Sequence, residues 1–98
     1  MERKKLTKYK NIIGHIITEL YSKIDVYIFN IEIECDDIFF NFRIGKLYII
    51  RLSLPYKTLS LSKKHSDGYR TIYADSTRNI NIVLDDIINI INKELKNG

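Results

Sequence analysis

The residues of this chain that could support catalysis are few, and their spacing does not suit it. His65, Ser66 and Asp67 supply the three residue types of a hydrolase triad. Neighbours in a tight turn cannot form the linear relay that this chemistry needs. Asp85 and Asp86 are adjacent on an expected helix, so their carboxylates diverge and cannot act as a paired acid and base. The sequence therefore predicts a protein that is not an enzyme.

Metal and cofactor sites are also unsupported. The two histidines and the single cysteine lie far apart, unlike the ligands of a zinc site. The four glycines are scattered and form no phosphate-binding loop. Acidic residues gather at the first expected hairpin, where they form a solvated end or attract a cation or a basic partner surface: Glu32, Glu34, Asp36 and Asp37. We expect neither a metal nor a cofactor.

Basic and aromatic residues that could bind nucleic acid are concentrated in an expected second hairpin. The chain carries a net charge of +4, and this hairpin interleaves cations with tyrosines: Lys63, Lys64, Tyr69, Arg70 and Tyr73. Single-stranded nucleic acid is bound by basic surfaces with stacking aromatic rings. Nucleic-acid binding is therefore the alternative function, beside the simpler interpretation of a solubilising surface.

The elements that position these residues follow from the hydrophobic periodicity. Apolar residues recur at helical spacing over Leu6–Ile24 and over Asn79–Lys96. Strand patterns fill the chain between these helices: Val26–Cys35, Ile38–Ile44, Leu47–Leu54, Thr58–Lys64 and Tyr69–Asp75. The chain is thus expected to be one α+β domain over residues 1–98. It should form a helix, a four- or five-stranded antiparallel meander and a second helix, with the two helices packed on one sheet face.

Turn lengths give an expected strand register. A two-residue turn at 36–37 pairs Ile33 with Phe40. A three-residue turn with its glycine in the left-handed conformation pairs Phe40 with Tyr48, and so sets Phe39 opposite Ile49. In the second hairpin, alternation places four residues inward and the tyrosines outward: Leu59, Leu61, Ile72 and Ala74 face in.

This register leaves apolar residues on the sheet face that the helices do not cover. Phe39 and Ile49 lie there with Leu47, Val26 and Ile28 nearby. A monomer rarely leaves such a patch bare. We therefore predict a non-enzymatic protein-binding module that contacts a host protein, or a second copy of itself as a homodimer, through the following residues: Phe39, Ile49, Arg43, Arg51, Glu32 and Glu34.

Composition adds a hypothesis about origin. The chain is rich in Ile, Lys and Asn, a bias typical of A/T-rich coding sequences such as those of low-GC bacteria and their phages. We interpret it as a phage or mobile-element inhibitor of a host factor, in the manner of anti-CRISPR proteins. No apolar run reaches the roughly 20 residues that span a bilayer, and the charged start is not a signal peptide. We expect a cytoplasmic protein without membrane contact.

The order helix, strands, helix resembles the double-stranded RNA-binding domain. That family binds phosphates through a Lys-rich start to its second helix, so the resemblance implies RNA contacts over Ser76–Asn81. This segment reads Ser-Thr-Arg-Asn-Ile-Asn, with one basic residue, and an extra hairpin intervenes before it. Because the departure falls on the phosphate-binding residues, the family's function is not carried over to this chain.

Overall fold

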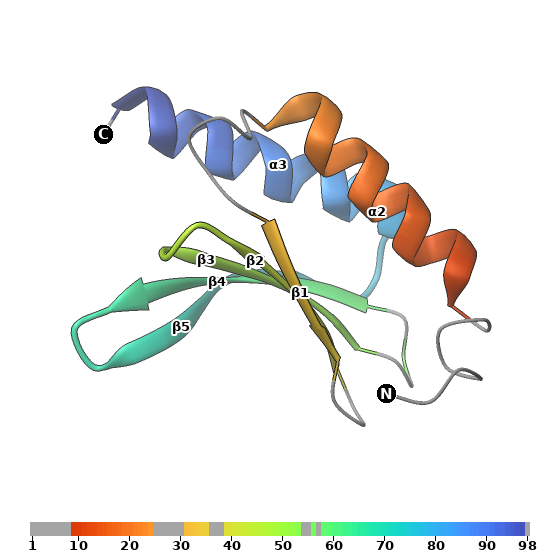
Figure 1. Ribbon diagram of the computed structural model, residues 1–98, viewed down its shortest axis with the longest axis horizontal. Coiled ribbons are helices and arrows are strands. Elements are labelled where there is room, and N and C mark those ends of the chain that lie inside the picture. The colour runs from red at the N-terminus through yellow and green to blue at the C-terminus, as the bar shows by residue number, and fades with distance from the viewer. Residues whose placement is uncertain (1–8, 25–30, 36–38, 54–55, 57, 98) are drawn as a thin grey trace.

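The fold is known from a computed structural model, which describes residues 9–24, 31–35, 39–53, 56 and 58–97 (Figure 1). The predicted order of helix, antiparallel strands and helix is confirmed, with five strands. The elements are α2 (Lys10–Lys23), β1 (Ile31–Cys35), β2 (Phe39–Ile44), β3 (Tyr48–Ser53), β4 (Thr58–His65), β5 (Gly68–Asp75) and α3 (Ile80–Asn97).

The five strands form one antiparallel sheet in the order β1-β2-β3-β4-β5, so each strand pairs with its neighbours in sequence. Both helices lie on the same side of this sheet, as Figure 1 shows. The result is the expected two-layer α+β sandwich. The opposite side of the sheet, here called the open face, has no described helix over it.

The core lies between the helices and the sheet. Helix α2 buries Ile13, Ile16 and Leu20 at helical spacing. Helix α3 and the sheet supply most of the other buried side chains, among them Val83, Leu84, Ile87, Ile88 and Ile91 from α3 and Phe40, Phe42, Ile44, Ile50, Leu52, Leu59 and Leu61 from the strands. Burial of this continuous apolar surface is the main stabilising contribution to the fold.

Polar contacts join the end of α2 to the interior of α3. Lys23 Nζ at the end of α2 lies 3.1 Å from Asp85 Oδ1 of α3, and the side-chain amide of Asn92 donates to the Lys23 carbonyl at 3.0 Å. The start of α3 is capped by Asn79, whose Oδ1 accepts the Asn81 N–H at 2.8 Å. The two contacts at Lys23 tie α3 to α2, and the cap at Asn79 stabilises the start of α3 itself.

The expected register of the first two hairpins is wrong. Ile33 pairs with Phe42 rather than with Phe40. Phe40 pairs with Leu52, whereas Tyr48 pairs with Ile44. In both hairpins the pairing is displaced by an even number of residues, so the same side chains still share a face.

The two displacements have different origins. Cys35 pairs with Phe40, so the first turn is longer than the two residues expected. The second turn does have three residues, and Gly45 takes the predicted positive φ, at 59°. Such a turn closes on Ile44 and Tyr48, however, and this moves Phe39 away from Ile49 to lie opposite Ser53.

A β-bulge changes the facing of β5. The register shifts between Leu61 and Ser62, which pair with Tyr73 and Thr71, so Ile72 is the extra residue. The expected inward positions of Ile72 and Ala74 are therefore wrong, as is the outward position of Tyr73. Ile72 is exposed, while Tyr73 packs against the core on the helix side.

Candidate binding face of the sheet

The open face is built from rows of side chains that cross the strands. One row contains Glu34, Asn41, Arg51, Ser60 and Ala74, and the next contains Glu32, Arg43, Ile49, Ser62 and Thr71. Phe39, Ser53 and Thr58 form a third row beside Arg51. All six residues predicted to contact a protein partner thus lie on this one face.

Arg51 is held in place by two neighbours on β2. Its guanidinium carbon lies 4.6 Å from the centre of the Phe39 ring, a distance at which the cation is attracted to the π face. Its Nε donates to Asn41 Oδ1 at 2.9 Å. The ring and the amide together fix the guanidinium, so a ligand would not need to order this side chain on binding.

A groove of about 210 Å³ lies next to this arginine. We call it the Arg51 groove, and its wall includes Phe39, Arg51, Ser53, Thr58, Ser60 and Asp75. The groove exists because the small side chains of Ser53, Thr58 and Ser60 stand beside the large side chains of Phe39 and Arg51 in adjacent rows. Sequence reasoning missed the groove, although the small hydroxyl residues at alternating positions of β4 were a signal for it.

The acidic residue in the groove wall is paired within the chain. Asp75 accepts hydrogen bonds from the Thr77 backbone N–H at 2.8 Å and from the Thr77 hydroxyl at 2.7 Å. Its other oxygen lies 2.6 Å from Arg78 Nε. These donors, Thr77 first and then Arg78, hold the pKa of Asp75 well below its usual range. The carboxylate is ionised, but its charge is offset locally.

On the open face, Arg43 extends across the sheet and contacts both Glu34 and Tyr69. Its Nε lies 3.0 Å from Glu34 Oε1, and its guanidinium lies 5.9 Å from the centre of the Tyr69 ring. The Tyr69 hydroxyl donates to the Lys46 carbonyl at 3.0 Å. Because Arg43 is on β2 and Tyr69 on β5, their contact passes above β3 and β4.

The largest departure from the sequence-based expectation is at Ile49, in the same row as Arg43. Ile49 was expected to be an exposed contact residue, but it is only 3 % exposed. It lies between Arg43 and Ser62 in its row, and long arginine stems cover apolar surface well. Leu47 is exposed in the turn, whereas Val26 and Ile28 lie outside the described residues. The open face is therefore mixed polar and aromatic.

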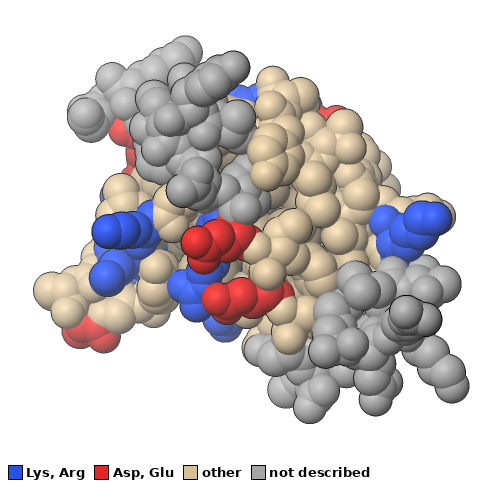
Figure 2. Space-filling view, viewed as in Figure 1, with Lys and Arg blue, Asp and Glu red and all other residues tan. Residues whose placement is uncertain are grey.

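Charge on the open face is mixed as well. Glu32 and Glu34 of β1 are both exposed. Figure 2 shows acidic side chains at the centre of the view, over β1, with basic side chains directly beside them. Arg43 has an acidic partner on this face, whereas no carboxylate of the described residues pairs with Arg51.

The hairpin residues predicted to bind nucleic acid are divided between the two sides of the sheet. Lys63 faces the helices, where its Nζ lies 3.0 Å from Glu94 Oε1 of α3. Glu94 also accepts a hydrogen bond from the Tyr48 hydroxyl. That bond, followed by Lys63, lowers the pKa of Glu94. Burial and the same bond raise the pKa of Tyr48.

Tyr73 is also part of a helix-side cluster. Its hydroxyl donates to Asp86 Oδ2 at 2.9 Å and accepts a hydrogen bond from Arg78. Arg78 Nη2 in turn lies 2.5 Å from Asp86 Oδ2. We call Tyr73, Arg78, Asp86 and Asp75 the β5–α3 clasp, because it ties the last strand to the last helix. Tyr73 is therefore not presented for stacking.

The other hairpin residues lie near its tip. Arg70 Nη2 is 2.6 Å from Asp67 Oδ2, within the hairpin itself. Lys64 and Tyr69 pair with each other across β4 and β5 and face the open side. The structure thus brings together two of the five predicted residues and directs the other three elsewhere.

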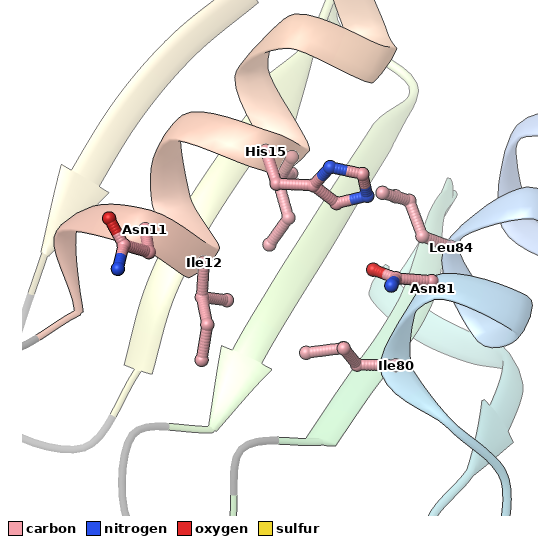
Figure 3. Close-up of a pocket in the computed structure, with 7 residues that line it drawn as sticks. Asn11, Ile12, His15, Ile80, Asn81 and Leu84 are labelled. Atoms are coloured by element: carbon pink, nitrogen blue, oxygen red, sulfur yellow. The ribbon is translucent and has the colours of Figure 1, made fainter.

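A second groove, of about 270 Å³, lies between α2 and α3. Figure 3 shows the His15 ring extending from α2 toward α3, next to Leu84, with Ile12, Ile80 and Asn81 around the same space. The lining is apolar apart from one imidazole and side-chain amides. Sequence reasoning did not identify this groove, because it depends on how the two helices are placed.

The geometry of the open face is the basis for interpreting its function. Within the described ranges, no group of three or more His, Cys, Asp or Glu side chains is placed to hold a metal ion. None of the described helices is long and apolar enough to cross a membrane. Comparison of the chain with protein-family models, curated proteins and solved structures gives no match.

Proposed function

We propose that this chain is a non-enzymatic protein-binding module that contacts its partner through the open face. The observation that carries the proposal is the fixed pair of Arg51 and Phe39 beside a groove. Arginine and aromatic residues dominate the energetically important positions of protein interfaces. A side chain that is already ordered loses less conformational entropy on binding.

Charge around this pair supports a specific partner. Glu32 and Glu34 are exposed at one edge of the face, and Arg43 lies beside them. Alternating charges of this kind favour a complementary surface and disfavour others. The composition supports the finer hypothesis of a cytoplasmic phage or mobile-element inhibitor of a host factor, similar in kind to anti-CRISPR proteins. A second copy of this chain is the other candidate occupant.

Nucleic-acid binding through the second hairpin has weaker support. Lys63 and Arg70 are already paired with carboxylates, and Tyr73 donates to one. Lys64 and Tyr69 remain on the open face for such a role. A platform for single-stranded nucleic acid needs several free cations and stacked rings together. A protein partner therefore accounts better for the arrangement of this face.

A capture experiment tests the proposal. The tagged protein is incubated with bacterial lysate, with and without nuclease, and the mass of the purified protein is measured by light scattering. We expect a protein partner, or a dimer, that survives nuclease treatment and 0.5 M salt, because screening at roughly that concentration weakens phosphate contacts far more than a buried interface. Phe39→Asp should abolish the association.

The matched control is Tyr56→Asp, which makes the same kind of change at a highly exposed aromatic residue (81 % exposed) outside the sheet. It should leave the association intact, and circular dichroism should show that both variants are folded. If nuclease removes the captured material, the hairpin alternative replaces this proposal. If the protein is monomeric and captures nothing, the proposal is wrong.

A further inference from the structure

We propose that the Arg51 groove binds a carboxylate, supplied by an acidic side chain of the partner protein. This inference rests on the proposed function and names the chemistry of the partner at this site. The guanidinium of Arg51 has N–H groups that the described residues leave unused. Its Nε is used by Asn41, and among the described residues no carboxylate forms an ion pair with it. The two terminal nitrogens remain for a ligand.

The shape of the guanidinium selects the ligand. Two parallel N–H groups of one arginine match the two oxygens of one carboxylate, and such bidentate pairs are among the stronger hydrogen-bonded contacts in proteins. Phe39 supports the guanidinium from one side at 4.6 Å. Hydroxyl groups of Ser53, Thr58 and Ser60 line the same groove and supply further possible donors.

The charge of the groove favours a monoanion over phosphate. Arg51 is the cation of this groove, and Asp75 lies in the wall. Arg78 lies 2.6 Å from Asp75 but is shared with Asp86, so it offsets the charge of Asp75 in part and at most one positive charge is left for a ligand. Phosphate sites generally combine an arginine or lysine with several backbone N–H groups, as at a helix N-terminus. A carboxylate with a short aliphatic stem therefore suits the groove better.

The side chain of a single acidic residue is the probe for this site. N-acetyl-glutamate amide is titrated into isotope-labelled protein while NMR follows the Arg51 Nε–Hε resonance and the amides of Ser53 and Ser60. The neutral N-acetyl-glutamine amide is titrated in parallel, and so is inorganic phosphate, all at one ionic strength. We expect saturation by the glutamate probe with a Kd on the order of a few mM, as for an efficient ligand of this size. Neither of the other two probes should saturate.

Variants assign the effect to Arg51. Arg51→Gln should weaken binding of the glutamate probe at least about tenfold, the range expected for a charge-assisted bidentate contact. Lys93→Gln makes the same change of charge on the exposed surface of α3 and should leave the Kd within about twofold, as expected of a screened charge. The amide spectrum of each variant reports whether it is folded. The wild-type comparison of the glutamate and glutamine probes needs no variant at all.

Three results would overturn the inference. They are saturation by phosphate but not by the glutamate probe, equal responses to the glutamate and glutamine probes, and unchanged binding in Arg51→Gln. Failure here is distinct from failure of the proposed function. A partner lost with Phe39→Asp but retained by Arg51→Gln would leave the binding module intact and remove the carboxylate site. If the glutamate probe saturates but no partner is captured, the carboxylate site would stand and the proposed binding module would not.

Discussion

The burial of Ile49 gives the sharpest test of how the open face is built. Substitution of Ile49 by alanine removes carbon atoms from a side chain that is 3 % exposed. At about 0.8 kcal/mol for each of roughly three buried carbons, the lost transfer free energy is about 2.4 kcal/mol. The cavity left behind adds to this loss, so we expect the free energy of unfolding to fall by about 3 kcal/mol.

The measurement is urea unfolding followed by circular dichroism, together with thermal melts. In a domain of this size each kcal/mol moves Tm by about 4–8 °C, so Ile49→Ala should lower Tm by about 12–24 °C. The matched control is Ile33→Ala, the same substitution in a strand at a side chain that is 43 % exposed. With half of the transfer term and no enclosed cavity, it should cost about 1 kcal/mol.

The comparison separates two descriptions of the same face. If Ile49 is an exposed contact residue, its truncation should cost no more than that of Ile33. The expectation from burial is wrong if the two variants lose free energies of unfolding that differ by less than about 0.5 kcal/mol. Differences of that size are within the usual error of comparing separate mutations. Such a result would also restore the apolar patch that the sequence suggested.

Other predictions concern acid stability and backbone conformation. The lowered pKa of Glu94, caused first by the Tyr48 hydrogen bond and then by Lys63, makes its ionised form stabilising. This stabilisation is present above the ordinary pKa of 4.5 and is lost as the pH falls through the lowered value. Between pH 6 and pH 2, the urea midpoint should therefore fall less in Glu94→Gln than in the wild type. Equal falls in the two proteins would contradict this prediction. Gly68 has a φ of 122°, so Gly68→Ala should lower the free energy of unfolding by about 1–3 kcal/mol. Gly14 lies in α2, and no neighbouring atom comes within 4 Å of the place that an alanine methyl group would occupy. Gly14→Ala should therefore raise the free energy of unfolding by up to about 1 kcal/mol. If thermal melts show that the two glycine substitutions change stability in the same direction, these backbone conformations are wrong.

Much of the candidate site was predictable residue by residue, because side-chain facing depends on a local period. Alternation along β2 and β3 placed Phe39, Arg43 and Arg51 on one face. The displaced registers did not disturb that result, since each displacement was even. What alternation could not supply was the neighbour of each residue across the strands, and so neither the Arg51–Asn41 bond nor the Arg51 groove was foreseen.

The bulge in β5 shows where local periodicity fails. A single extra residue at Ile72 exchanges the two faces for the rest of the strand. It carries Tyr73 to the helix side, where Asp86 accepts its hydroxyl hydrogen bond. Nothing in the strand's own sequence marks this position, because the bulge is a property of pairing with β4 and of packing against α3.

The sequence by itself determined the order of the elements and, outside the bulged strand β5, which strand residues face the helices. These follow from composition and short-range periodicity, which each segment carries alone. Only the tertiary structure decided which open-face residues are accessible. Arg43 and Tyr69 come from strands that are not adjacent, yet they meet on the face where Ile49 is buried, while Arg51 stays beside an open groove. Burial depends on side chains brought together from distant parts of the chain, and no local pattern encodes it.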